Sequence, residues 1–132
     1  MIKSRKYPPY KNNKPSFTAK LPGVYLIYKN NELMYVGYSN YNVYKTLYRH
    51  FQKWNDPQQK RVVYKKNDKT ITVRVIYTTA IRSKKLEKAL ILKYKPIDNP
   101  EKYENYILDK KSEKVLDQAE NEFTTSIENL PF

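Results

Sequence analysis

The sequence predicts an α+β domain in which an antiparallel sheet is flanked by helices. Two observations carry this prediction. β-rich runs that are neighbours in the sequence and are joined by short turns favour antiparallel pairing, and two segments show apolar residues at helical spacing. With 132 residues, of which 39% are apolar and 14% aromatic, the chain is long enough for one core of ordinary size. Its composition is globular and not that of a disordered chain.

The first 20 residues are predicted to form a basic extended arm. Pro8, Pro9 and Pro15 occur there among lysines and asparagines, a composition that breaks regular structure. Arms of this kind often follow the phosphates of a nucleic acid.

A β-hairpin is predicted next, from residues 23–28 and 33–37, which are rich in β-branched and aromatic residues. A two-residue loop at Asn30-Asn31 would pair residues whose numbers sum to 61 and would place Tyr25 and Tyr35 on opposite faces. A loop centred on Asn30 gives a sum of 60 and sets Tyr25 directly opposite Tyr35. We predict the second register, because a three-residue loop needs a left-handed residue at its last position and Asn31 tolerates that conformation.

Apolar residues at helical spacing predict a first helix from about Asn42 to Trp54, ended by Asp56-Pro57. The apolar positions are Val43, Leu47, Phe51 and Trp54. Two further β-rich runs are expected at 61–65 and 70–78, around a turn at 66–69.

A second helix is predicted from about Ser83 to Tyr94, and Pro96 stops it. Its inward face comprises Leu86, Ala89, Leu90 and either Lys93 or Tyr94. A weaker helical pattern follows near residues 112–123. We therefore predict an arm at 1–20, a folded domain at 21–100 and an acidic C-terminal appendage at 101–132.

Charge is distributed unevenly along the chain. Residues 1–100 carry 22 basic and 5 acidic side chains, a net charge of +17, whereas residues 101–132 carry 4 basic and 8 acidic ones, a net of −4. The first part is predicted to bind a polyanion, DNA or RNA, although such charge can also serve only to keep a surface solvated. The acidic part can dock a protein partner or act as an intramolecular decoy for the basic face.

Several functional classes are excluded by composition. The chain has no cysteine, which excludes disulfides, thiolate zinc sites and a cysteine nucleophile. His50 is the only histidine, so a bound metal must be a hard cation held by oxygen. We find neither an apolar run long enough to cross a membrane nor a signal-like N-terminus, and therefore expect a soluble, cytoplasmic protein without membrane contact.

Gly23-Val24-Tyr25 followed by Tyr35-Val36-Gly37 resembles the GIY-YIG nuclease superfamily. The second predicted helix, with Glu87-Lys88-Ala89-Leu90-Ile91 followed by Lys95-Pro96 and Asn99, is similar to the metal-binding helix of that family. The resemblance covers residues 21–100. It implies a three-stranded antiparallel sheet with flanking helices, which cuts a phosphodiester bond with one divalent cation, Mg²⁺ or Mn²⁺.

The resemblance also implies roles for individual residues. Glu87 would hold the metal, while Tyr25, Tyr35 and His50 would orient water or phosphate, by hydrogen bonds or as a base. Each has a structural alternative, because tyrosines pack in sheets, a lone histidine is often structural, and Glu87 has lysines one turn away. We expect Gly37 to end the second strand, either as a plain terminator or where a substrate backbone approaches.

One residue departs from the family pattern. The position of the usual catalytic arginine is Thr46 here. Arg49 lies three residues further along the helix and can reach the same phosphate, whereas Lys45 points about a hundred degrees away. We expect Arg49 to supply the charge, with Lys45 as the other candidate. Asn99 either bonds backbone near the site or caps the turn after Pro96, and we favour the cap.

Three functions remain open from the sequence. The leading prediction is a metal-dependent endonuclease that hydrolyses DNA by water attack, without an organic cofactor. The second is a nucleic-acid-binding module of the same fold, which has lost cleavage through Thr46 and serves a larger assembly. The third is a basic structural protein.

Overall fold

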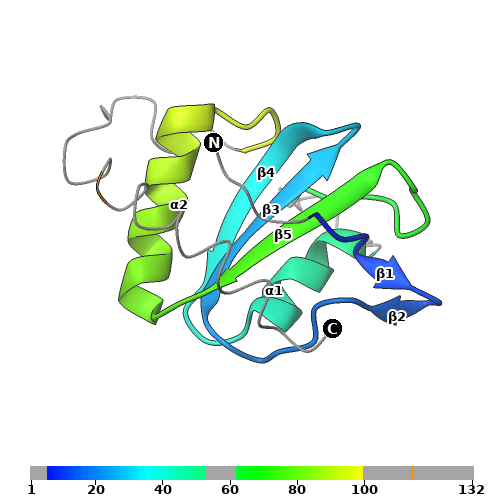
Figure 1. Cartoon of the computed structure of the whole chain (residues 1–132), viewed down its shortest axis with the longest axis horizontal. Helices are drawn as coiled ribbons and strands as arrows, with labels where there is room; N and C mark the ends of the chain where they lie inside the picture. Colours follow the sequence, from blue (N-terminus) through cyan, green and yellow to red (C-terminus); the bar gives the residue numbers. More distant parts are fainter. Residues whose placement is uncertain (1–5, 53–61, 100–113, 115–132) are drawn as a thin grey trace, which may run out of the picture.

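A three-stranded antiparallel sheet forms the centre of the protein, with the strand order β4-β3-β5 (Figure 1). The computed structural model describes residues 6–52, 62–99 and 114. The sheet strands are β3 (Gly23–Lys29), β4 (Glu32–Ser39) and β5 (Ile71–Tyr77), and the helices are α1 (Val43–Tyr48), the short 3-10 helix η1 (Arg49–Phe51) and α2 (Ala80–Tyr94). This arrangement confirms the predicted α+β class.

Helices cover both faces of the sheet, so the central strand β3 is buried along nearly its whole length. Val24, Leu26 and Tyr28 pack with α2 on one face, whereas Tyr25 and Ile27 pack with α1 on the other. This alternation follows from the two-residue period of a strand. Residues on β4, the edge strand, therefore lie where both helices meet the sheet, and the candidate site forms there.

The β3–β4 hairpin has a different register from the one predicted. Asn30 and Asn31 both have positive φ, 51° and 64°, and form a two-residue turn that pairs Lys29 with Glu32. A bulge at Met34 then shifts the pairing, so that Tyr25 lies opposite Gly37 and not opposite Tyr35. The predicted register, with paired residue numbers that sum to 60, was wrong. It assumed a three-residue loop, whereas the loop has two residues, both in the left-handed conformation. The extra bulge residue nevertheless restores the parity that places Tyr25 and Tyr35 on one face.

The helices differ from their predicted bounds. The first α-helix begins at Val43, close to the predicted start, and Asn42 caps it. Its α-helical part ends at Tyr48, and one 3-10 turn continues to Phe51. Trp54 and Asp56-Pro57 lie outside the described residues. The second helix begins three residues before the predicted start, because the side chain of Thr79 caps it by accepting the backbone N–H of Arg82. Lys93 and Tyr94 are exposed, in contrast to the predicted inward orientation.

One predicted β-rich run, 61–65, does not join the sheet over the residues that the structure describes there, 62–65. This segment instead lies along η1, where the backbone N–H of Tyr64 donates to the carbonyl of His50 at 2.6 Å. The turn at 66–69 and the strand after it follow the prediction. The weak helical pattern at 112–123 and the acidic appendage lie outside the described residues, apart from position 114.

Part of the predicted N-terminal arm packs on the domain. Residues Tyr10–Lys11 (β1) and Lys14–Pro15 (β2) form a small hairpin whose turn again consists of two left-handed asparagines, Asn12 and Asn13. Phe17 is fully buried in the core on the α1 face. Within the described part of the chain, no helix is long and apolar enough to cross a membrane.

Candidate active site

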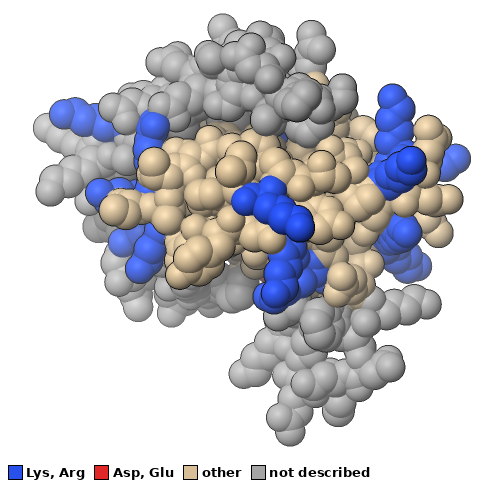
Figure 2. Space-filling model, turned by 90° about the horizontal axis from the view of Figure 1, so that it is seen from below, with Lys and Arg blue, Asp and Glu red and all other residues tan. Residues whose placement is uncertain are grey.

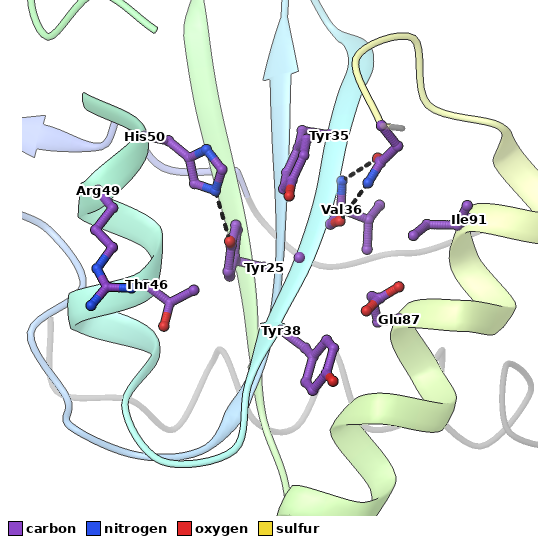
Figure 3. Close-up of a pocket in the computed structure, with 11 residues that line it drawn as sticks. Tyr25, Tyr35, Val36, Tyr38, Thr46, Arg49, His50, Glu87 and Ile91 are labelled. Atoms are coloured by element: carbon purple, nitrogen blue, oxygen red, sulfur yellow. Dashed lines mark hydrogen bonds between the residues drawn. The ribbon is translucent and has the colours of Figure 1, made fainter. Parts of the chain in front are cut away.

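A pocket of about 310 Å³ opens at strand β4, between α1 with η1 on one side and α2 on the other (Figure 3). It gathers residues that are distant in the sequence, because β4 is the edge strand on which both helices converge. Its lining contains Tyr25, Tyr35, Val36, Gly37, Tyr38, Thr46, Arg49, His50, Glu87, Ile91 and Asn99.

Tyr25 and His50 form the polar centre of one wall. The Tyr25 hydroxyl lies 2.8 Å from Nε2 of His50, and Nδ1 of His50 lies 2.7 Å from the backbone carbonyl of Val62. A carbonyl only accepts hydrogen bonds, so in the neutral ring Nδ1 carries the proton and Nε2 presents its lone pair to the Tyr25 hydroxyl. Both side chains are almost fully buried, which holds this chain of hydrogen bonds in place.

Tyr35 completes an aromatic cluster with these two residues. Its ring stacks near that of Tyr25, with centroids 6.2 Å apart and planes 21° from parallel, and it lies 4.6 Å from the His50 ring. The cluster exists because the bulge at Met34 returns Tyr35 to the face of Tyr25.

Gly37 makes room for the Tyr25 side chain. A Cβ built on Gly37 would lie 2.8 Å from Cε2 of Tyr25 and closer still to its Cζ and hydroxyl. Gly37 lies inside β4, which continues to Ser39, so the expectation that it ends the strand was wrong. The space next to Gly37 is filled by the phenol of Tyr25.

Glu87 lies across the pocket from the tyrosines, on α2, and its side chain is directed toward the sheet near Tyr38 (Figure 3). It is only 3% exposed, although it belongs to a helix rich in lysine. The burial argues against a surface carboxylate that merely pairs with neighbouring lysines.

The donor set at the pocket suits a hard cation. Among the described residues there is no group of three or more His, Cys, Asp and Glu side chains that would enclose a metal. The pocket instead offers one carboxylate, Glu87, together with hydroxyl oxygens. Mg²⁺ is usually bound by one or two carboxylates, with water and substrate phosphate completing its shell. The residues present therefore fit Mg²⁺ or Mn²⁺ and do not fit a zinc site.

Thr46 and Arg49 both line the pocket from the α1 side (Figure 3). The Thr46 hydroxyl donates to the backbone carbonyl of Asn42 at 3.2 Å. The structure brings Arg49 to the pocket, as expected from its position one turn after Thr46. Lys45 is exposed and does not line the pocket.

Asn99 binds the edge of β4. Its side-chain amide accepts from the backbone N–H of Val36 at 2.8 Å and donates to the carbonyl of the same residue at 2.9 Å. Our preferred expectation, a cap of the turn after Pro96, was therefore wrong, and the other one, a bond to backbone near the site, is what the structure contains. The neighbouring Asp98 donates its N–H to the carbonyl of Met34 at 2.7 Å.

Sequence reasoning missed the residues that support this wall. Val62 orients His50 through its carbonyl, which no sequence pattern reveals. Tyr64 donates its hydroxyl to Asp98 at 2.8 Å, so the segment that holds His50 is tied to the segment that covers β4. Burial, followed by the Asp98 carboxylate, raises the pKa of Tyr64. Tyr38 was also missed, although strand alternation places it on the α2 face beside Glu87.

Comparison with known proteins agrees with this geometry. A family model described as the GIY-YIG catalytic domain matches residues 21–104, a span that contains every residue lining the pocket. No curated protein and no solved structure matches the chain. A domain of this kind supports a nuclease-type function in general. Because the match extends over well more than half of the sequence, the chain belongs to the GIY-YIG catalytic domain family.

Proposed function

We propose that this chain is an endonuclease that hydrolyses DNA phosphodiester bonds by water attack, with Mg²⁺ or Mn²⁺ bound at Glu87. The observation that carries the proposal is the hydrogen-bonded row formed by the Val62 carbonyl, His50 and the Tyr25 hydroxyl. Tyr25 and His50 line the same pocket as the buried carboxylate of Glu87, and the Val62 carbonyl orients His50. Family membership supports the general class of nuclease, and this geometry supports the specific reaction.

The row provides a path for the proton that an attacking water must lose. The Tyr25 hydroxyl donates to Nε2 of His50, so the transfer of that proton leaves the phenol oxygen able to accept one from water. The water oxygen then bonds to phosphorus while the bond to the leaving oxygen breaks. The Val62 carbonyl stabilises the doubly protonated ring, since it already accepts from Nδ1.

Arg49 and Tyr35 are proposed to hold the phosphate. The guanidinium presents a planar fork of donors, which matches phosphate oxygens and remains charged at any working pH. Tyr35 presents a hydroxyl at the same pocket. Where the family usually has an arginine, this chain has Thr46. Arg49, three residues later, is proposed to take over its role.

Glu87 is proposed to hold the cation, which when bound withdraws charge from the phosphate oxygens and from the leaving group. Its burial favours this role, because a buried carboxylate has lost hydration that a cation can replace. The site needs only one protein carboxylate, since water and phosphate complete the shell.

Nucleic acid is the proposed substrate because residues 1–100 carry a net charge of +17. Figure 2 shows one face of the molecule with Lys and Arg and without Asp or Glu among the described residues. Contacts of this kind go to phosphates and carry no sequence information directly. The acidic segment 101–132 is proposed to dock a protein partner or to compete with DNA.

A nicking assay tests the proposal. Supercoiled plasmid is incubated with Mg²⁺ or Mn²⁺ and with wild type, Tyr25→Phe, Glu87→Gln or Tyr94→Phe. The first two variants remove one hydroxyl or one charge from the pocket and should abolish nicking. Tyr94→Phe removes a hydroxyl outside the pocket and should nick normally.

The second candidate function, a binding module without cleavage, is favoured by one observation, Thr46 at the usual arginine position. If wild type binds DNA in a gel-shift assay but cuts neither the plasmid nor DNA with unpaired nucleotides, with either metal, the binding module is established and the endonuclease is rejected.

A further inference from the structure

A second hollow, of about 370 Å³, lies at the start of α2, beside the turn that follows β4. It is lined by Asn40, Tyr41, Ala80, Ile81, Lys84 and Lys85. None of these residues belongs to the lining of the candidate active site. Its composition combines apolar surface with positive charge.

Two large apolar side chains project into solvent here. Tyr41 is 82% exposed and Ile81 is 74% exposed, the two highest values among the exposed large hydrophobic residues described. Their backbones are held firmly. The Ser39 hydroxyl oxygen accepts from the N–H groups of Tyr41 and Asn42, at 3.2 and 2.9 Å, and Ile81 occupies the capped first turn of α2. Fixed, exposed apolar groups at a hollow mark a surface for binding.

The charge at this hollow indicates an anionic partner. Lys84 and Lys85 line it, and no acidic residue is in its lining or in the first turn of α2. The positive end of the α2 dipole adds to the same field. A ligand that suits both features has a flat apolar group and a phosphate. A nucleotide whose base is not stacked on its neighbours has this chemistry.

The hollow is close to the candidate active site along two elements. On α2, Lys84 precedes Glu87 by three residues, so their Cβ atoms are about 5 to 6 Å apart on one helix surface. On the sheet side, Tyr38 lines the active-site pocket and Asn40, two residues later, lines the hollow. We therefore expect a strand whose phosphate lies at Glu87 to reach the hollow with an adjacent nucleotide.

We propose that Tyr41 and Ile81 receive an unstacked base next to the phosphate that is cut, while Lys84 and Lys85 contact the flanking backbone. This inference rests on the proposed nuclease function for the position of the cut, but the binding site itself does not depend on cleavage. The faces of bases within an intact duplex are covered by their neighbours, and exposing them costs free energy. The substrate class is therefore nucleic acid with unpaired nucleotides at the site, in preference to continuous duplex.

Binding without metal tests the inference. The full chain is titrated, in EDTA, into three fluorescein-labelled DNAs: a single strand, the matching duplex, and the same duplex with one unpaired nucleotide. Tyr41→Ala should weaken binding of the two DNAs with unpaired bases about 5- to 150-fold, the range for loss of one base–aromatic stack. It should change duplex binding by less than about twofold. Tyr41→Phe keeps the ring and should bind as wild type.

Matched variants separate stacking from charge and from folding. Lys84→Ala removes one positive charge from α2 at the hollow, and Lys93→Ala removes one from the last turn of the same helix. Only Lys84→Ala should weaken all three DNAs and reduce the salt dependence of binding. Circular dichroism should show the same fold for every variant, since Tyr41 is exposed. Ile81→Ser provides a second test of the apolar wall, with the same expected selectivity.

The inference and the proposed function fail separately. If Tyr41→Ala and Ile81→Ser weaken duplex binding as much as single-strand binding, or weaken neither, the base site is rejected whatever the nicking assay gives. If wild type prefers unpaired DNA through Tyr41 but, with Mg²⁺ or Mn²⁺, cuts neither the plasmid nor the duplex with one unpaired nucleotide, the base site stands and the endonuclease does not.

Discussion

At the scale of single residues, the Tyr25 phenol occupies a space that exists only because residue 37 is glycine. The hairpin register sets these two residues opposite each other, and a Cβ at position 37 would meet the ring atoms of Tyr25. The hydrogen bond to His50 depends on the place of that ring. We therefore expect Gly37 to act on the site through Tyr25.

Gly37→Ala should therefore displace the Tyr25 ring. We expect a loss of about 1–3 kcal/mol in the free energy of unfolding, the usual cost of one extra methyl group in a packed place. Nicking should fall by more than tenfold under the proposed mechanism. Urea denaturation and the plasmid assay measure the two effects.

The control is a double-mutant cycle with Tyr25→Ala, which empties the space above position 37. Gly37→Ala should cost much less stability in that background than in wild type. Additive losses would mean that the added methyl group acts on something other than Tyr25.

A second prediction at this scale concerns the source of positive charge. Arg49 lines the pocket and Lys45 does not. Arg49→Ala should lower the nicking rate about 10²- to 10³-fold, the usual effect of removing one donor that stabilises developing charge. Lys45→Ala, which removes one positive charge from α1 about one turn before Arg49, should lower it less than tenfold. The assignment of Arg49 is wrong if Lys45→Ala abolishes nicking while Arg49→Ala leaves it intact.

At the scale of elements, the sequence pattern predicted where most strands and helices form. It did not predict the register in which the strands pair. The alternating and helical patterns of residues 23–37 and 83–94 come from burial, which a sequence records directly. Register depends on the conformation of two asparagines and on a bulge at Met34, and composition does not determine either. The same Asn-Asn turn closes the β1–β2 hairpin, and that repetition was a signal available in the sequence.

The segment at 62–65 shows why the site was only partly predictable. Its β-branched and aromatic residues predicted a strand, but its backbone bonds to His50 through Val62 and Tyr64 instead of extending the sheet. Tyrosine and glutamate positions followed from the motif, whereas the carbonyl that orients His50 and the contact from Tyr64 to Asp98 arise from tertiary packing. Such contacts leave no local pattern in a single sequence.

The tyrosines packed against the α1 face give an element-scale prediction on pH. Burial raises the pKa of Tyr48, Tyr64 and Tyr77, the last to about 12, from an ordinary value of 10.0. The fold favours the neutral phenols, so their contribution to stability is complete below pH 10. It is lost as the pH rises from 10 toward 12. The free energy of unfolding in urea should fall steadily between pH 10 and pH 11.5.

Absorbance at 295 nm reports tyrosine ionisation directly and provides the check. The native protein should ionise several tyrosines only above pH 11, whereas the urea-unfolded chain should ionise all of its 14 tyrosines near pH 10. Tyr77→Phe should reduce the loss of stability above pH 10. Identical titration curves for the native and unfolded protein would contradict the prediction.

At the scale of the whole molecule, the pocket and the hollow at α2 lie on a strongly basic body. A surface of this kind binds DNA mainly through phosphates, so affinity should fall steeply with salt. A basic body also attracts the chain's own acidic residues, 8 of which lie in residues 101–132 beside only 4 basic ones. If the segment 101–132 binds the basic face, it competes with DNA for that face.

Removal of residues 105–132 tests that competition and keeps the matched family region whole. If the acidic segment is a decoy, the shortened chain should bind a single-stranded oligonucleotide several-fold more tightly at 50 mM salt than the full chain does. The difference should shrink at 300 mM salt, because screening weakens both competitors. A full-length variant whose acidic residues after 104 are changed to Asn or Gln should bind like the shortened chain. Equal affinity of all three proteins at every salt concentration would reject the decoy and leave docking of a protein partner as the role proposed for this segment.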